Sequence, residues 1–137
     1  MNDIILNKKI SVERCVKQIR EYYALNPDIP FEQDYLKQDA IAINLQRLCE
    51  TCIDIANYWI RRKKLGLPQD SADAFALLYR AGAISEDMSR ALKGMVGFRN
   101  VLIHEYKKLD LAIMVDVIEH HLREPLDFAN LALQALD

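Results

Sequence analysis

The sequence predicts an all-α protein, an up-and-down bundle of four to five helices that forms a single domain over residues 1–137. About half of the residues are apolar, and glycine and proline occur only four times each, which is untypical of disordered chains and of turn-rich β proteins. Apolar residues also recur with a period near 3.6 along most of the chain. The breaks in that period coincide with proline, glycine or capping residues, so we expect antiparallel helices with short connections.

The first two helices are long and clearly delimited. The first is expected from Asp3 to Leu25 and ends before "NPDIPFEQD", because proline cannot continue the hydrogen-bond ladder of a helix. Asp34 is placed to cap a second helix that reaches toward Lys64. This second helix carries two adjacent apolar stripes. So wide an apolar arc predicts a central helix with several neighbours, which could include another subunit.

Three further helices follow. Ser71 begins a short third helix that Gly82 can end. Ser85 begins the fourth, with acidic residues in its first turn, where they favour the positive end of the helix dipole. Asp110 can cap the last, which keeps its helical period to the end of the chain and is expected to bend at Pro125.

The bulk composition excludes several classes of protein. No apolar run approaches the ~20 residues that a membrane span needs, and the N-terminal residues lack a signal-peptide pattern. Three cysteines, an odd number, suit the reducing cytoplasm. The net charge of −2 gives no broad attraction to nucleic acid, so any RNA binding must be local.

The stretch "GMVGFRNVLIHEYKK", residues 94–108, is unusual for a buried helix because polar residues interrupt its apolar pattern. On a regular helix Gly97, Asn100 and His104 fall nearly opposite the core face, with Gly94 beside them. Each glycine in a helix interior costs roughly 1 kcal/mol relative to alanine. We therefore expect the missing side chains to admit another helix, or a substrate backbone, close to Asn100 and His104.

Arg99 and His104 carry the chemistry that metal-free RNA cleavage requires. An imidazole moves protons near neutral pH, and a guanidinium binds a phosphate as its charge grows. Asn100, four residues before His104, is placed to orient it or to hold the phosphate. Arg99 and His104 point about 140° apart on an ideal helix. Either the arginine side chain bends round, or a helix bulge realigns the pair, or two copies of this helix meet at an interface. Without further context, a surface helix with a hydrogen-bonded histidine is the more common meaning of such a pair.

The run "RNVLIHEY", residues 99–106, resembles the R-x4-6-H signature of HEPN domains. In its R-x4-H-x-Y form it looks like the HepT-type toxins of HEPN/MNT (type II) toxin–antitoxin pairs. The chain length, the helical plan and the position of the motif late in the chain, after "VGF", are similar as well. The resemblance implies a homodimer in which two motif helices form one composite ribonuclease site.

The resemblance also implies roles for the motif residues. Arg99 would bind and stabilise the phosphate, His104 would act as general acid and base, and Asn100 would support them. No metal or other cofactor would be needed, and cleavage through the ribose 2′-hydroxyl would leave a cyclic phosphate. Tyr106 would receive AMP from ATP, transferred by a cognate MNT-type nucleotidyltransferase antitoxin. Arg99 and Tyr106 are seven residues apart and are expected to share one stripe of the helix. A phosphate on Tyr106 would then occupy Arg99 or exclude RNA, which silences the toxin.

Other polar or reactive groups have less specific meanings. Lys107 and Lys108 directly follow the motif and are candidate RNA contacts. The basic run at 61–64 ends the second helix, where positive charge complements the helix dipole, so a structural role is favoured over RNA binding. The lone CxxC at 49–52 has no second pair to complete a zinc site, and we expect both cysteines to be buried as small apolar residues.

Two other functions remain open at the level of the sequence. The chain could be a non-catalytic HEPN-like module that binds nucleotide or RNA, or that positions the nucleotidyltransferase on its substrate. It could also be the neutralising member of the pair. The presence of both Arg99 and His104 favours the ribonuclease, since a scaffold needs neither.

Overall fold

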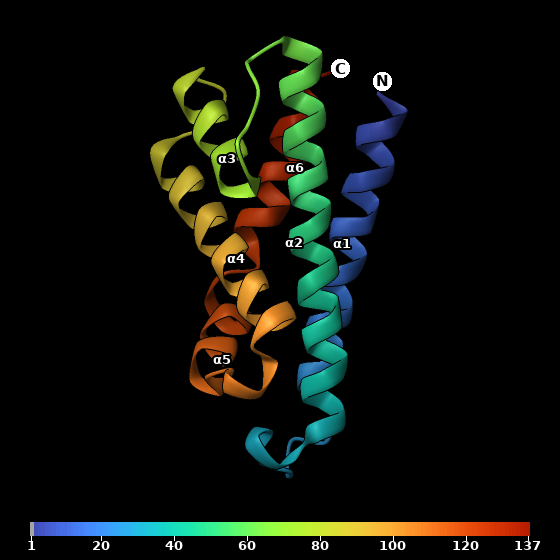
Figure 1. Ribbon diagram of the computed structural model, residues 1–137. Helices are drawn as coiled ribbons and strands as arrows, with labels where there is room; N and C mark the ends of the chain where they lie inside the picture. The colour runs from blue at the N-terminus through green and yellow to red at the C-terminus, as the bar shows by residue number, and fades with distance from the viewer. Residues whose placement is uncertain (1) are drawn as a thin grey trace.

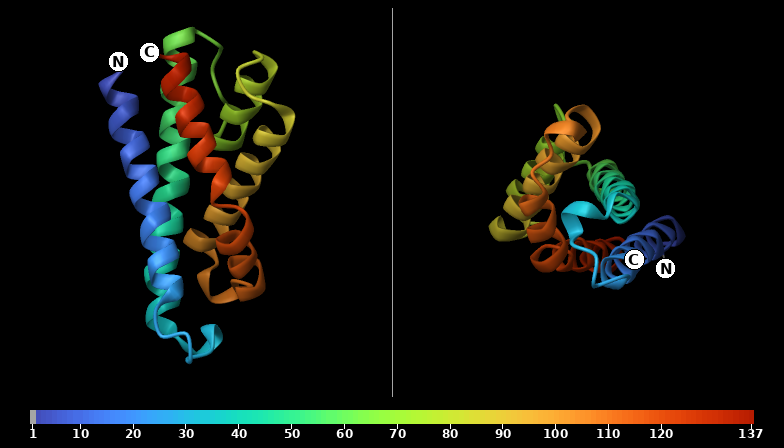
Figure 2. Two further views of the ribbon diagram at one scale, coloured as in Figure 1. Left: turned by 180° about the vertical axis from the view of Figure 1, so that it is seen from behind. Right: turned by 90° about the horizontal axis from the view of Figure 1, so that it is seen from below.

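A computed structural model describes residues 2–137 as a helical bundle without strands. Four longer helices alternate in direction along the bundle, and both termini lie at the same end (Figures 1 and 2). The α-helices are α1 (Asp3–Ala24), α2 (Tyr35–Lys63), α3 (Ser71–Arg80), α4 (Glu86–His104), α5 (Leu111–His120) and α6 (Arg123–Ala135), and the short 3-10 helices are η1 (Phe31–Gln33) and η2 (Tyr106–Lys108). The predicted all-α, up-and-down architecture is confirmed.

Helix α2 is the central element, as its two apolar stripes predict. It packs against α1, α3, α4 and α6. The Asp34 side chain accepts a hydrogen bond from the backbone N–H of Lys37 (3.1 Å) and so caps its first turn. The helix ends where Lys64 adopts a left-handed conformation with φ 54°, which lets the N–H of Leu65 donate to the carbonyl of Ile60.

The core has an aromatic centre that joins three helices. Phe128 of α6 lies against Trp59 of α2 and Phe75 of α3, with ring centroids 5.9 and 5.5 Å apart. All three side chains are buried. They belong to one continuous apolar core to which every α-helix contributes. This core fixes the position of α4 relative to α2, and the candidate site lies between these two helices.

The segment expected to be one bent helix, residues 110–136, is two helices. Proline has no N–H to donate, and its ring would collide with the carbonyl four residues earlier. Accordingly α5 ends at His120, and α6 begins at Arg123. Pro125 is thereby placed in the first turn of α6, where a missing N–H breaks no hydrogen bond. The prediction located the irregularity correctly but underestimated it.

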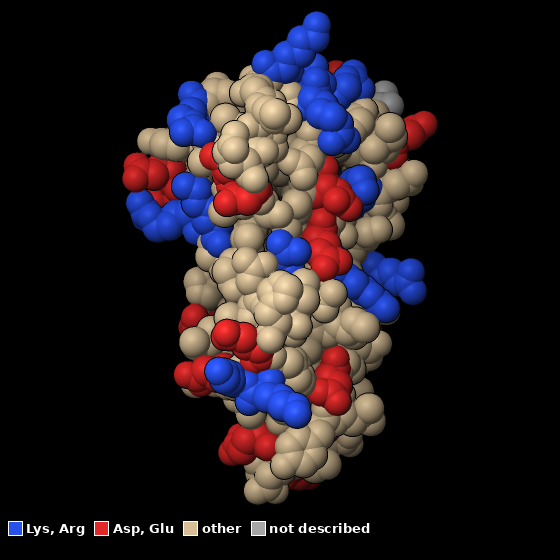
Figure 3. Space-filling view, viewed as in Figure 1, with Lys and Arg blue, Asp and Glu red and all other residues tan. Residues whose placement is uncertain are grey.

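Charges of both signs are mixed over the molecular surface. On the face shown in Figure 3, acidic and basic side chains alternate, and basic ones gather at the end where α2 terminates. Within residues 2–137, no helix combines the length and the apolar character needed to cross a membrane.

Candidate functional site

Helix α4 has a buried face and an open face, as the sequence predicts. Its buried face includes Met95, Phe98 and Leu102. On the other side Gly94, Gly97 and Asn100 are exposed. A Cβ atom added at either glycine would meet no atom within 4 Å. The expected close approach is therefore not made by any described part of this chain, and the face is available to another molecule.

Arg99 is half-buried where α4 faces α2. Burial raises the pKa of the Cys49 thiol of α2 to about 12, and the positive charge of Arg99 partly opposes that rise, so the guanidinium lies near this thiol. The Nε atom of Arg99 is buried without a hydrogen-bond partner. Arg99 also forms no ion pair within residues 2–137. A partly buried cation without a counter-charge is unfavourable, so the position is suited to an anionic ligand.

His104 is the last residue of α4, and its side chain is exposed. The helix is regular through residues 99–104, and the N–H of Glu105 still donates to the carbonyl of Val101 (2.9 Å). No bulge therefore realigns Arg99 with His104, which removes one of the three alternatives. The two side chains diverge as predicted: one is half-buried against α2, and the other is in solvent. Asn100 is exposed on the same side of α4 as His104.

Tyr106 lies outside α4, so the expected helical stripe shared with Arg99 is wrong. The α-helix ends at His104, and Tyr106 begins η2. Its hydroxyl donates a hydrogen bond to Oδ1 of Asp39 on α2, at 2.7 Å. Partial burial, the hydrogen bond to Asp39 and the negative charge of Asp39, in that order, raise the pKa of Tyr106 to about 12. The two residues line a small cleft of about 170 Å³.

Asp39 is the residue that sequence reasoning missed. It is 67 positions from Tyr106, and no motif surrounds it. The only available signal is a carboxylate in the first turns of a helix, and that pattern is usually explained by the helix dipole. Its contact with Tyr106 depends on how α4 packs on α2, which the linear pattern does not specify.

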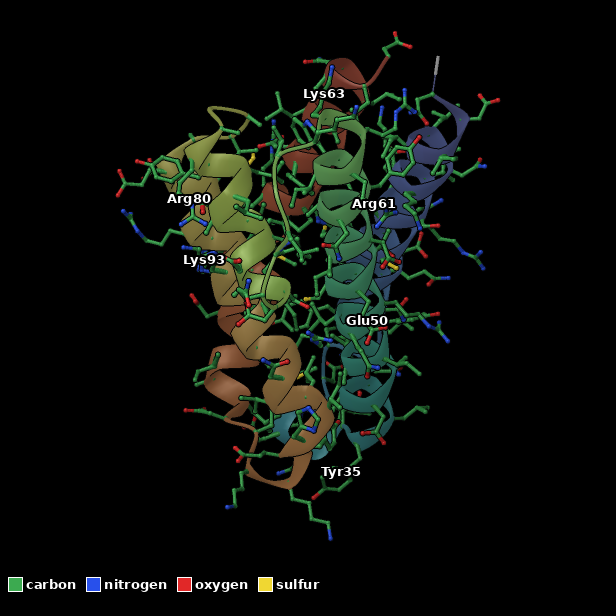
Figure 4. The ribbon with its side chains drawn as sticks, turned by 45° about the horizontal axis from the view of Figure 1, so that its top comes forward. Tyr35, Glu50, Arg61, Lys63, Arg80 and Lys93 are labelled. Carbon is green, nitrogen blue, oxygen red and sulfur yellow. The ribbon has the colours of Figure 1, made fainter. Side chains whose placement is uncertain are left out.

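The other predicted residues are separated into two regions. Lys107 and Lys108 are exposed in η2, next to Tyr106. The basic run 61–64 lies at the opposite end of α2 (Figure 4). There Arg62 donates a hydrogen bond to the hydroxyl of Tyr58 (2.7 Å) and lies over its ring, contacts that favour a structural role. The cysteines of the CxxC at 49–52 are buried, as predicted, and burial raises the pKa of both thiols.

Comparison with known proteins identifies a family and a relative that match most of this chain. The family model for ribonuclease HepT-like proteins matches residues 12–131. An mRNA nuclease HepT from Shewanella oneidensis is 47% identical over 124 residues, which are 90% of this chain and 92% of that protein.

Solved structures give the same relationship. The tri-AMPylated S. oneidensis HEPN toxin in complex with MNT antitoxin is similar with a TM-score of 0.90 and 44% identity, over 98% of this chain and 99% of that chain. A crystal structure of a toxin–antitoxin with AMP-PNP gives 0.89 and 44%, over 96% and 99%. The Bacillus subtilis cytosolic protein YutE, at 20% identity and a TM-score of 0.70 over 91% and 87%, shares the fold. This chain belongs to the ribonuclease HepT-like family.

Proposed function

We propose that this chain is the toxin of a HEPN/MNT toxin–antitoxin pair and that it cleaves RNA without a metal ion, using Arg99 and His104. The observation that carries the proposal is the state of Arg99: within residues 2–137 its half-buried guanidinium forms no ion pair, and its buried Nε has no hydrogen-bond partner. An RNA phosphate supplies the missing negative charge. Family membership and the related mRNA nuclease support the same activity. We place the protein in the cytoplasm, where its three free thiols remain reduced.

The chemistry follows from the two side chains. The ribose 2′-oxygen attacks the adjacent phosphorus, a bond to that oxygen forms, and the bond from phosphorus to the 5′-oxygen breaks. An imidazole takes the proton of the 2′-hydroxyl, and an imidazolium gives a proton to the departing 5′-oxygen. The Arg99 guanidinium stabilises the charge that develops on the phosphate oxygens. The products are a 2′,3′-cyclic phosphate and a free 5′-hydroxyl.

A homodimer brings these groups together. Since α4 is regular, His104 and Arg99 of one chain point in different directions. A second copy packed on the open α4 face would place the histidine of one protomer opposite the arginine of the other. The exposed glycines Gly94 and Gly97 leave room for that approach. The dimer then holds two histidines, one to accept and one to donate a proton.

Silencing of this site involves Tyr106 and an MNT-type nucleotidyltransferase antitoxin. The related HEPN toxin is tri-AMPylated in a complex with MNT antitoxin, and we propose that Tyr106 is the acceptor here. Its oxygen attacks the α-phosphorus of ATP, and pyrophosphate leaves. The hydroxyl proton passes to Asp39, to which it is already hydrogen-bonded. The attached phosphate, two residues from His104, excludes the RNA phosphate by charge and bulk.

The cleavage test compares unmodified protein with four variants on a cellular RNA pool in EDTA. Arg99→Ala and His104→Ala are expected to lower the rate at least ~100-fold, as loss of a transition-state or proton-transfer group does. Arg90→Ala, on the same helix, and His120→Ala, on α5, are the matched controls and should retain activity, because both side chains are exposed. Activity that survives both motif substitutions would contradict the assignment. No activity in protein shown by mass to be unmodified would favour the binding-module function.

The acceptor is tested with purified antitoxin and ATP. Intact mass should increase in steps of AMP for the parent protein and for Tyr79→Phe, a control at another exposed tyrosine. Tyr106→Phe should gain nothing. Equal gains in all three proteins would place the modification on another residue.

A further inference from the structure

A cleft between α1 and α2 combines the groups that bind a nucleotide. It has a volume of about 460 Å³ and is lined by residues of both helices. Arg14 of α1 and Arg47 of α2 line it, and neither forms an ion pair within residues 2–137. By contrast, Arg80, Arg90 and Arg123 each form an ion pair with an acidic side chain. The cleft is therefore a local concentration of uncompensated positive charge in a chain whose net charge is −2.

The two arginines act on the same point. Burial raises the pKa of the Cys15 thiol in this cleft, and the charges of Arg47 and Arg14 oppose the rise. Both guanidiniums are thus close enough to one atom to affect its ionisation. Two guanidiniums that line one cleft suit a phosphate better than isolated surface lysines do.

The rest of the lining fits a ribonucleotide rather than a bare anion. Tyr22 offers an aromatic surface against which a base can stack. Asn44 is only 4% exposed, and its Nδ2 donates to the carbonyl of Ala40 (2.8 Å). Its Oδ1 is buried and has no hydrogen-bond partner in the part of the chain that the structure describes. An unpaired buried acceptor is unfavourable, and a ribose hydroxyl or base amino group could satisfy it after a small adjustment. Gln18 adds a further amide.

The α1/α2 cleft adjoins the small cleft beside Tyr106, which is two residues from His104 of the proposed cleavage site. Ile43, which is 47% exposed, lines both this cleft and the small cleft of Asp39 and Tyr106. Asp39 and Arg47 are eight residues apart on α2, which is about 12 Å along a helix axis. A strand of a few nucleotides spans such a distance.

We infer that the α1/α2 cleft is a subsite for single-stranded RNA, in which Arg14 and Arg47 bind a phosphate of the strand that flanks the cleaved bond. The inference rests on the proposed ribonuclease function, and it deepens that function by assigning where the substrate is held. It also explains how an acidic protein binds RNA: local guanidiniums replace a broad positive surface.

The test measures binding separately from cleavage. Fluorescence anisotropy follows a labelled single-stranded RNA oligonucleotide as it binds to His104→Ala protein, which leaves the RNA intact. Intact mass confirms that the protein carries no AMP. Attached AMP units, which are also joined by phosphodiester bonds, therefore do not compete with the RNA for the cleft. In this background Arg14→Ala/Arg47→Ala is compared with Arg80→Ala/Arg90→Ala. The control removes the same charge from arginines that are paired elsewhere.

We expect the cleft variant to bind RNA at least ~10-fold more weakly at ~0.1 M salt, and its slope of log affinity against log salt to fall by about 0.7, since the two arginines bind one phosphate and each neutralised phosphate of a single strand contributes ~0.7. The control should bind like the parent. Equal binding by both variants, or equal weakening, would overturn the inference. A change of dimer mass in the cleft variant, measured by light scattering, would also overturn it, because the cleft would then be a protein interface. Should the parent bind RNA through the cleft while unsubstituted protein cleaves none, the subsite would stand and the cleavage proposal would fail.

Discussion

Arg99 and Tyr106 both lie against α2, but only Tyr106 has a partner there of complementary charge. Arg99 is half-buried and has no counter-charge among residues 2–137, whereas the hydroxyl of Tyr106 donates a hydrogen bond to the carboxylate of Asp39 at 2.7 Å. An unpaired cation is ready for a phosphate, and a tyrosine hydrogen-bonded to a carboxylate has an acceptor for its proton. At the residue scale, therefore, contacts with α2 prepare both Arg99, which is proposed to bind the RNA phosphate, and Tyr106, which is proposed to receive AMP.

The pKa of Tyr106 reports on its partial burial and on its contact with Asp39. Because this pKa is raised to about 12 in the folded protein, above its ordinary value near 10, the contact stabilises the fold fully below pH 10 and is lost as the pH rises toward 12. Since Tyr106 is 38% exposed, the stabilisation is only about 1 kcal/mol. Spectrophotometric titration should show a late-titrating phenol that is lost in Tyr106→Phe. In Asp39→Asn it should titrate nearer pH 10, and an unchanged late phenol would contradict the contact.

At the element scale, capping residues and breaks in the apolar period are sufficient to predict most helix boundaries. Asp34, Ser85 and Asp110 cap helices in the structure as expected. The failures have physical causes. Pro125 separates two helices instead of bending one, because its ring would collide with the carbonyl four residues earlier if α5 continued through it. The end of α4 at His104 removes Tyr106 from the motif helix, and no breaker residue in the sequence indicates that stop.

Glycine substitutions on α4 test whether its face is open. In Gly97→Ala the added Cβ meets no atom within 4 Å, so the helix should gain roughly 1 kcal/mol in free energy of unfolding. Gly82→Ala is the contrasting control: its φ of +77° disfavours alanine, so that variant should lose stability. Chemical denaturation measures both. The homodimer proposal adds that Gly97→Ala weakens self-association in sedimentation. A loss of stability in Gly97→Ala would contradict an unobstructed face.

At the scale of the whole molecule, one apolar core holds all the helices together, while each candidate site combines residues from different helices. The all-helical bundle is predictable because its core depends on local periodicity. The contact between Asp39 and Tyr106, and the convergence of Arg14 and Arg47, join residues far apart in the chain. Such contacts depend on the packing of helices, which no local pattern specifies. The divergence of Arg99 and His104, by contrast, follows from helical geometry alone and was predicted from their spacing.

The aromatic centre of the core should dominate stability. Phe128→Ala removes a buried ring that contacts Trp59 and Phe75, and we expect a loss of about 3–5 kcal/mol in free energy of unfolding. Leu67→Ala, at a side chain that is 82% exposed, should change it by less than ~0.5 kcal/mol. Urea titration followed by circular dichroism compares the two. Similar midpoints would contradict the central role of Phe128.

Complementation between inactive variants tests the composite ribonuclease site most directly. Arg99→Ala and His104→Ala homodimers are partly unfolded in denaturant, mixed and refolded together, so that mixed dimers form, and RNA cleavage is measured in EDTA. Each mixed dimer has one intact Arg99 and one intact His104, on different protomers. We predict that the mixture cleaves RNA faster than either parent but more slowly than the unsubstituted dimer, because each mixed dimer retains only one of its two histidines, and that each variant refolded alone remains inactive. A mixture as inactive as its parents, with mixed dimers confirmed by native mass spectrometry, would show that the two residues must act from the same chain.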